Sequence, residues 1–550
     1  MMTKKQKFLS LTSLMTIAIA PATIWACTDQ NPSSSGNLPP SNSKPEAGKP
    51  DGPNNDAKPP VTNQPLPLGQ FGTWNDQTLD FSSAQFWANQ PNLDAKVFNL
   101  WRDLETNKNK INEKLSYEIH TIDVGQADSL LLKFSPLDPD YFQNELNLGT
   151  NWKTSEAYIN NTFNILIDAG NFKAENKDKK TITPNYETKL KNYLNQELAG
   201  GDKIDLFVLT HEDADHIGQA QKVMQDFGKP NESVLLNFGD GDKETDTLKK
   251  LMTFVAKNGY VYVDPLIDQV FNQNLINQVL NPPANQDPKK VSPFQAFLSN
   301  ETYGKWETDA QGQKTNFLWN PEKLFKIEPT ADLIKFSDYS YFSFLAPTVD
   351  YAPNKTNEVN ESSINTFLKI ASPNKQEFSA LFTGDSEGKT HKDVLKVMRS
   401  NTKFQKAGGS IKVDVHKVAH HGSTTKQSNN ADFLAAITDS QTKYLISVNT
   451  NKLFSNSPTL KDEFWQNLNQ ALIQDSANPI AFANQVFITQ NLGDILFSGT
   501  ANQKTLNIKT TSRKLQAQNQ IWNSKSRFTD NPITINDQFA NFLYKRKIKF

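Results

Sequence analysis

The sequence predicts a layered α/β domain, and three observations lead to that prediction. Short apolar runs that end in polar turns recur from Ser116 onward, helical stretches lie between several of them, and the chain has 550 residues. Strands that alternate with helices are typical of α/β layers. The length suits roughly two to four ordinary domains, or one enlarged domain with insertions.

The predicted strands are short, apolar and bounded by polar residues. They are Glu118–Val124, Ser129–Phe134, Phe163–Ile167, Ile204–Leu209, Tyr341–Leu345, Asn365–Ile370, Ser379–Phe382, Ile411–Val418 and Tyr444–Val448. The predicted helices between them are Glu187–Leu198, Gly218–Phe227, His391–Arg399 and Lys461–Ile473. Residues 228–335 are too many for a plain connection, so we expect an insertion there.

Composition excludes several classes of protein. The chain has 58 basic and 59 acidic side chains, so it lacks the basic excess of histone-like or ribosomal proteins. Only residues 8–26 approach a membrane-length apolar run, which argues against a multi-pass membrane protein. The single Cys excludes an internal disulfide framework and a zinc site built from Cys.

The N-terminus has the pattern of a bacterial lipoprotein signal. Lysines among residues 4–7 precede an apolar stretch over 8–24, and Ala26 stands directly before Cys27, while the bulky Trp25 departs from the usual pattern. We expect a signal peptide at 1–26 and acyl chains such as palmitate on Cys27, which would hold the protein on the outer face of the cell membrane. The alternative is an uncleaved anchor with an incidental Cys.

The segments on either side of the main domain differ from it in composition. Residues 28–70 contain ten of the 29 Pro and almost no large apolar side chains, so 27–70 is predicted to be a disordered stalk. Spaced aromatic residues predict an N-terminal helical extension over 71–115. The main domain would then span 116–511, with a C-terminal tail at 512–550.

The densest chemical signal is the run Leu209–Gly218. A buried strand there delivers two imidazoles, His211 and His216, and the carboxylates of Asp213 and Asp215 into one turn. Such a group is costly to bury unless a cation lies among its members. Histidine and carboxylate are good ligands for zinc or manganese. The alternative is a solvated acidic turn that caps a helix.

Two further turns strengthen the case for a metal. Thr383–Asp385 presents one carboxylate at a strand end, and His420–Ser423 presents two adjacent imidazoles. Four of the seven His therefore lie in two strand-end turns.

Taken together, these motifs resemble the metallo-β-lactamase superfamily, specifically the branch that contains the soluble domain of ComEC-type competence proteins (DNA internalisation). The matching elements occur in the family's order at Asp123–Ser129, Leu166–Gly170, Thr210–His216, Asn360–Ser363, Thr383–Asp385, His420–Ser423 and Val486–Ile495. The resemblance implies a four-layer αββα sandwich with a large insertion and an N-terminal helical extension. It also implies that Val486–Thr489 and Gly493–Ile495 form a closing hairpin.

The resemblance also implies a role for each site residue. Two divalent ions, zinc or manganese, would be held by His211, Asp213, Asp215, His216, Asp385 and either His420 or His421. Asp385 would bridge the ions, and Asp215 would serve catalysis as well as binding. Asp168 would orient the metal-binding side chains without itself binding a metal. Asp123 and Asp128 would shape the floor of the site or contact the substrate. Ser423, with Thr424, would donate hydrogen bonds to a phosphate or leaving group.

These roles predict a surface-anchored, metal-dependent hydrolase that acts on phosphodiesters of nucleic acid or nucleotides. Asp213 stands where lactam hydrolases of the family carry His, which favours phosphoesters. Ser457 replaces a His that ends a late loop in the family, so turnover could be slow or the substrate different. Two alternatives are a phosphocholine-type phosphoesterase and a non-catalytic adhesin or scaffold. The sequence does not allow a protein partner to be predicted.

The remaining histidines are predicted to be structural. We expect His120 in a core or edge strand, His391 at the start of a surface helix and His416 on the wetter face of its strand. An aromatic platform for single-stranded nucleic acid is an open alternative for four insertion residues, Tyr260, Tyr262, Trp306 and Trp319.

Overall fold

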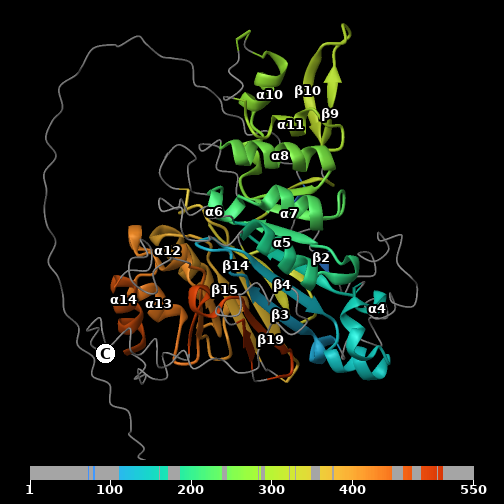
Figure 1. The fold of residues 1–550 in the computed structure, drawn as a ribbon. Helices are drawn as coiled ribbons and strands as arrows, with labels where there is room; N and C mark the ends of the chain where they lie inside the picture. The colour runs from blue at the N-terminus through green and yellow to red at the C-terminus, as the bar shows by residue number, and fades with distance from the viewer. Residues whose placement is uncertain are drawn as a thin grey trace, which may run out of the picture. The chain divides into compact units, whose positions relative to one another are not determined.

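The computed structural model describes most of the chain between residues 111 and 511 and two short strands before it (Figure 1). The described residues are 72–73, 79–80, 111–159, 161–170, 186–237, 245–282, 284–285, 291–320, 322–328, 330–347, 359–374, 377–448, 462–473, 485–503 and 506–511. All of them lie in the unit Gln64–Phe550. The predicted signal peptide, Cys27, the stalk, Ser457 and the 512–550 tail fall outside this description. Within it, no helix has the length and apolar character needed to span a membrane.

Ten of the described strands pair into a first sheet, in the order β1–β11–β8–β7–β6–β5–β4–β3–β19–β20. In that order they are Gly72–Thr73, Leu324–Lys326, Val261–Asp264, Val234–Asn237, Leu206–Leu209, Phe163–Ile167, Leu130–Ser135, Ser116–Thr121, Ile495–Thr500 and Asn507–Thr510. The pairs from β1 to β5 are parallel, and the pairs from β5 to β20 are antiparallel.

Eight described strands form a second sheet, in the order β18–β17–β16–β15–β14–β13–β12–β2. In that order they are Val486–Ile488, Lys443–Ile446, Val415–Lys417, Glu377–Phe382, Asn365–Ala371, Tyr341–Ala346, Asp332–Lys335 and Leu79–Asp80. The pairs from β18 to β15 are parallel. Parallel strands therefore lie in both sheets, and their carboxyl ends carry the turns predicted to bind metal.

The two sheets pack against each other through alternate side chains. In β6, Leu206 and Val208 join a core that also contains Phe342, Leu368 and other second-sheet residues. Phe207 of the same strand points the opposite way, into a core shared with helices. This alternation is the period-two pattern of a strand buried on both faces.

Helices cover the outer face of each sheet (Figure 1). The first sheet packs against α5 (Tyr186–Glu197), α7 (Ala220–Phe227) and α8 (Asp246–Asn258). The second packs against α12 (Gly388–Ser400), α13 (Ala431–Ile437) and α14 (Asp462–Ile473). Helix, sheet, sheet and helix make four layers, so the predicted αββα sandwich of the metallo-β-lactamase type is confirmed.

Shorter elements complete the described fold. The remaining α-helices are α4 (Glu156–Ile159), α6 (Ala214–Ile217), α9 (Ile267–Val270), α10 (Gln273–Leu280), α11 (Gln295–Leu298) and α16 (Thr489–Leu492). The other helical turns are Tyr141–Glu145, Gly149–Thr154, Ala199–Gly201, Thr402–Phe404, Ala419–Gly422 and Thr425–Gln427. A two-stranded antiparallel ribbon pairs β9 (Gly304–Thr308) with β10 (Lys314–Trp319).

Several predictions of local structure were wrong. The predicted closing hairpin does not form, because β18 pairs with β17 in the second sheet whereas β19 pairs with β3 in the first. Within the predicted helical extension, residues 72–73 and 79–80 are strands, and residues 111–114 are helical. In the stretch 228–335, strands β7, β8 and β11 belong to the first sheet itself.

The structure excludes the alternative of an aromatic platform. Tyr260 and Tyr262 are fully buried, Trp319 is nearly so, and Trp306 packs partly buried against the same core. Their rings stabilise the layer around α8 and the ribbon. They are therefore not available to stack on bases.

Candidate metal centre

The first metal-binding turn is fixed by a carboxylate on the neighbouring strand. Asp168 follows β5, with φ of 58°, and Thr210 follows β6. Thr210 donates to Asp168 twice, from its backbone N to Oδ1 at 2.8 Å and from its hydroxyl to Oδ2 at 2.8 Å. This clamp fixes the chain just before His211.

His216 takes its orientation from the same carboxylate. Its Nδ1 lies 2.7 Å from Asp168 Oδ2, where it donates, so Nε2 is the nitrogen that remains to bind a metal. That Nε2 is buried, has no hydrogen-bond partner and lies 3.2 Å from Asp385 Oδ1. Burial lowers the pKa of His216, but the carboxylates of Asp385 and Asp168 outweigh burial and raise it well above the usual value.

Asp385 reaches the centre from the second sheet. It follows β15 through Gly384, whose φ is +50° and whose missing side chain leaves room for Thr210, since a Cβ there would lie 2.8 Å from the Thr210 Cβ. The Asp385 backbone N donates to Ser363 Oγ at 3.2 Å. The two sheets therefore approach closely at the point where the carboxylate enters.

His421 is the second imidazole that faces the centre. It follows β16 in a left-handed conformation, with φ of 51°. Its Nδ1 donates to the Ser447 carbonyl at 2.7 Å, so Nε2 is the nitrogen that remains to bind a metal. Nε2 lies 3.4 Å from Asp215 Oδ2 and 3.7 Å from Asp385 Oδ2. Burial lowers the pKa of His421, but Asp385, Asp128 and Asp215 raise it to about 9.

Asp215, His216, Asp385 and His421 fit a metal ion. One ligand atom from each lies within 4.8 Å of the others. Both Nε2 atoms and Asp385 Oδ1 are buried without a hydrogen-bond partner. In the metal-free centre the raised pKa values keep the imidazoles of His216 and His421 protonated, and a divalent ion would displace those protons and bind the same nitrogens. The donor set suits zinc or manganese.

His211 and Asp213 lie beside this group. The His211 ring centre is 4.0 Å from that of His216, and its buried Nε2 lies 3.8 Å from Asp213 Oδ2. Burial and then the neighbouring His216 lower the pKa of His211 to about 4, so it is neutral at pH 7. With Asp385 they provide donors for a second ion, which stays a prediction.

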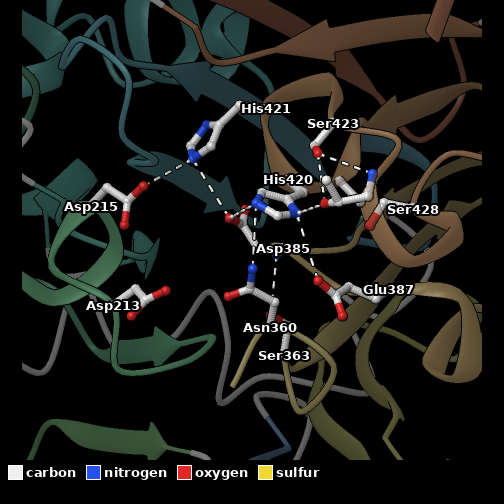
Figure 2. A network of polar contacts seen from close by, with 12 residues as sticks. Asp213, Asp215, Asn360, Ser363, Asp385, Glu387, His420, His421, Ser423 and Ser428 are labelled. Atoms are coloured by element: carbon white, nitrogen blue, oxygen red, sulfur yellow. Dashed lines mark hydrogen bonds and ion pairs between the residues drawn. The ribbon is translucent and has the colours of Figure 1, made fainter. Parts of the chain in front are cut away.

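His420 has different surroundings from His421 (Figure 2). Its side chain is 19% exposed, and its Nε2 accepts from Asn360 Nδ2 at 3.4 Å. The same Nε2 is 3.8 Å from Asp385 Oδ2, and Nδ1 is 4.0 Å from Glu387 Oε1. The structure thus favours His421 as the ligand and places His420 at the rim.

Asp128 was expected to shape the floor of the site or to meet substrate, and its position favours the first of these roles. It is 1% exposed, and Lys417 donates to its Oδ2 at 2.6 Å. Its backbone N donates to the Asp215 carbonyl at 3.0 Å, and its Oδ1 lies 3.7 Å from His421 Nδ1. Asp128 therefore supports two ligands from behind.

Asp123 and Ser423 are buried and have partners outside the ligand group. Asp123 pairs with buried Lys189 at 2.8 Å, and its backbone N donates to Asp494. Ser423 is 3% exposed and shares a hydrogen bond of 2.8 Å with Thr425. Its hydroxyl therefore already has a partner within the loop.

Sequence reasoning missed Lys417, Glu387 and Ser447. Lys417 could have been found, because it is a lone cation within the apolar run from Val415 to Ala419. Glu387 is buried and pairs with Lys426 at 3.0 Å. Ser447 contributes only its backbone carbonyl, which no sequence pattern marks.

The predictions for the other three histidines had mixed outcomes. His120 is buried in β3 as expected, 2.8 Å from the Tyr193 hydroxyl. His391 was expected on a surface helix but is 1% exposed and stacks on Phe433 at 3.8 Å. His416 was expected on a wet face but is fully buried, because α12 and α13 cover that face.

Comparison with known proteins agrees with this fold. Residues 156–241 match the family model of the metallo-beta-lactamase superfamily. The matched range contains β5, β6 and the turn from His211 to His216, but not Asp385 or His421. A search of curated proteins finds no match.

Solved structures similar to the chain include a long form RNase Z from yeast and the metallo-beta-lactamase MIM-1 from Novosphingobium pentaromativorans. The RNase Z is 12% identical with a TM-score of 0.24, and the match covers 72% of this chain and 46% of that one. MIM-1 is 8% identical with a TM-score of 0.22, and the match covers 66% of this chain and 89% of that one. The chain thus spans less than half of the RNase Z.

Proposed function

We propose that this protein is a metal-dependent hydrolase that cleaves phosphodiester bonds of nucleic acid or nucleotides. One observation carries the proposal. The Nε2 atoms of His216 and His421 face the carboxylates of Asp215 and Asp385, with one ligand atom from each of the four residues within 4.8 Å of the others.

The carboxylates favour a phosphoester substrate. Asp213, Asp215 and Asp385 provide oxygen ligands, so the centre is harder than one built mainly from imidazoles and suits manganese as well as zinc. When bound, two such ions lower the pKa of water and offset the negative charge of a phosphoryl group.

The surrounding residues orient the ligands and leave one side open. Asp168 and the Ser447 carbonyl each fix an imidazole, and Lys417 neutralises Asp128 behind them. Asp213 and Asp215 have side chains 32% and 29% exposed. A substrate would therefore approach across these carboxylates and the rim residue His420.

We further propose that acyl chains on Cys27 hold the enzyme on the outer face of the cell membrane. The lipobox-like residues before Cys27 support this placement. Mass spectrometry of the membrane fraction should find an acylated N-terminal Cys, and Cys27→Ala should release the protein. An N-terminal peptide that still includes residues before Cys27 would contradict the proposal.

Metal content and hydrolysis test the proposed centre. Purified protein should bind manganese or zinc and hydrolyse bis(p-nitrophenyl) phosphate and DNA. Asp385→Asn removes a ligand, so activity should fall by at least about 100-fold, together with metal content. Asp226→Asn, which alters a surface carboxylate paired with Lys191, is the matched control and should change neither.

Other results would redirect or end the proposal. Wild-type protein that retains no divalent metal by elemental analysis would overturn it. Turnover of a phosphocholine ester without turnover of DNA would favour the small-phosphoester alternative. Bound metal without any hydrolysis would favour a scaffold.

A further inference from the structure

A stripe of exposed cations runs along helix α12, outside the metal centre. Lys389, Lys392, Lys396 and Arg399 are all exposed. Their spacing of three, four and three residues places them on one face of the helix. At about 1.5 Å per residue the stripe is about 15 Å long. We call these four residues the α12 stripe.

The cations at the outer end of the stripe are not used within the fold. Lys392, Lys396 and Arg399 make no ion pair and no side-chain hydrogen bond with any described residue. Holding like charges together is unfavourable unless a partner neutralises them. The chain has a formal net charge of −1, so the clustering of these cations does not follow from an overall excess of basic residues.

Two hollows flank the stripe and meet along it. One of about 550 Å³ is lined by Lys392, Leu395, Lys396, Arg399 and Ser400. The other, of about 540 Å³, lies between α12, α13 and α14 and shares Lys392 and Leu395 with the first. Its lining also includes Gln427, Asn430 and Gln470, which carry amides, the carboxylate residue Asp432, and the buried residues His391 and Phe433.

The second hollow, between α12, α13 and α14, borders on segments that also reach the metal centre. Gly388, which lines it, begins α12 three residues after Asp385, and Gln427 follows Lys426, which pairs with Glu387 at 3.0 Å. Glu387 in turn lies beside His420 at the rim (Figure 2). The same helix therefore connects the centre to the stripe, and Figure 1 shows it beside α13 and α14.

We infer that the α12 stripe binds the backbone of a single-stranded nucleic acid and leads the strand to the metal centre. Phosphates at about 3.4 Å per nucleotide or more along a strand would meet successive cations. The hollows, with apolar and amide walls, would accept unstacked bases, which a duplex does not offer. The inference rests on the proposed function and names its substrate class.

Binding without hydrolysis tests the stripe directly. Metal-free full-length protein in EDTA would be titrated into fluorescein-labelled oligo(dT), and anisotropy followed from about 50 to 200 mM salt. Lys392→Gln/Lys396→Gln/Arg399→Gln should weaken binding at least about tenfold. The slope of log affinity against log salt should fall by about 2, since each phosphate contact on a single strand contributes about 0.7.

Two control variants test whether binding depends on where the positive charges lie, and not only on how many there are or on whether the protein folds. Lys250→Gln/Lys257→Gln/Lys305→Gln removes three exposed cations on α8 and β9 and should leave affinity and slope unchanged. Lys392→Arg/Lys396→Arg/Arg399→Lys keeps the charges and should bind like wild type. Equal weakening by both glutamine triples would overturn the inference, as would wild-type protein that does not bind oligo(dT).

Failure of the stripe and failure of the proposed function give different results. Wild-type hydrolysis of bis(p-nitrophenyl) phosphate without oligo(dT) binding would overturn the stripe and leave the metal centre. Stripe-dependent binding without any phosphodiester hydrolysis would overturn the proposed function and leave the stripe. Blunt duplex DNA bound as tightly as oligo(dT) would overturn the assignment to single strands.

Discussion

Hydrogen bonds on the far side of each imidazole determine what the centre can bind. His216 donates its Nδ1 proton to Asp168, and His421 donates its own to the Ser447 carbonyl. Each ring therefore directs its Nε2 towards carboxylate oxygens, where a metal ion would replace the proton. Proteins commonly orient metal-binding histidines in this way. The groups behind the ligands should matter nearly as much as the ligands.

Substitution of Lys417 tests most directly whether the residues behind the ligands matter. Both Lys417 and Asp128 are 1% exposed, so Lys417→Met leaves a buried carboxylate without its cation. The free energy of unfolding should fall by about 3–5 kcal/mol. Metal affinity should also fall, because Asp128 contacts the Asp215 loop and lies near His421. Urea unfolding and metal titration measure the two effects.

Two companion variants decide whether charge is the cause. Lys417→Met/Asp128→Asn removes both charges and should recover most of the lost stability. Lys369→Met in β14 breaks a partly exposed pair with Glu377 and should cost less than about 1 kcal/mol. A double variant no more stable than the single variant would point to packing instead of charge.

Among the strands and helices, close backbone contacts hold the ligand turns in register. The Gly170 N donates to the Asp128 carbonyl, and the Ala169 N donates to the His216 carbonyl. These bonds attach the segment after β5 to α6. A ligand carried by α6 therefore depends on how closely that segment can approach.

Gly170→Ala tests whether the metal-binding turn depends on this close contact between backbone segments. A Cβ at Gly170 would lie 1.7 Å from the Asp215 carbonyl oxygen and 2.9 Å from the Ala127 Cβ, so the Asp215 turn must move. We expect a stability loss of about 1–3 kcal/mol and metal binding weakened at least about tenfold. Gly312→Ala, at a turn with open space and φ of +75°, should lose stability only. Unchanged metal affinity in Gly170→Ala would contradict the argument.

Local patterns predicted the elements well but not their partners. The strand predicted at Asn365–Ile370 is observed at Asn365–Ala371, because a short, largely apolar run that is buried on both faces leaves a clear signal. The hairpin predicted near the C-terminal end was wrong, since no local pattern says which sheet a strand joins. The short strands at residues 72–73 and 79–80 owe their conformation to pairing with β11 and β12, far along the chain.

In the candidate site, too, local patterns could be predicted from the sequence but contacts between distant segments could not. Strand-end turns with His and Asp could be recognised, because the carboxyl ends of parallel strands gather at one edge. The pairing of Lys417 with Asp128 joins residues 289 positions apart, so spacing could not predict it. Burial of His391 and His416 was missed because polar residues are expected at surfaces.

The burial of these two histidines predicts that the free energy of unfolding of the whole fold decreases in acid. Burial and then nearby His416 lower the pKa of His391 to about 3, and burial and then nearby Lys417 lower the pKa of His416 to about 3. An unfolded His has a pKa of about 6.5. Between these values the unfolded chain binds more protons, so stability is full above about pH 6.5 and is lost as the pH falls through that window.

The size of the effect follows from the same values. From pH 7 to pH 5, each buried His should remove about 2 kcal/mol from the free energy of unfolding. His391→Leu/His416→Leu should therefore reduce the acid loss by about 4 kcal/mol relative to wild type, as measured by urea unfolding of metal-free protein at both pH values. Phe433→Leu, which alters the packing against His391 without removing a titrating group, should keep the wild-type loss. If the leucine double variant lost as much stability in acid as wild type, other groups would have to carry the acid sensitivity of the fold.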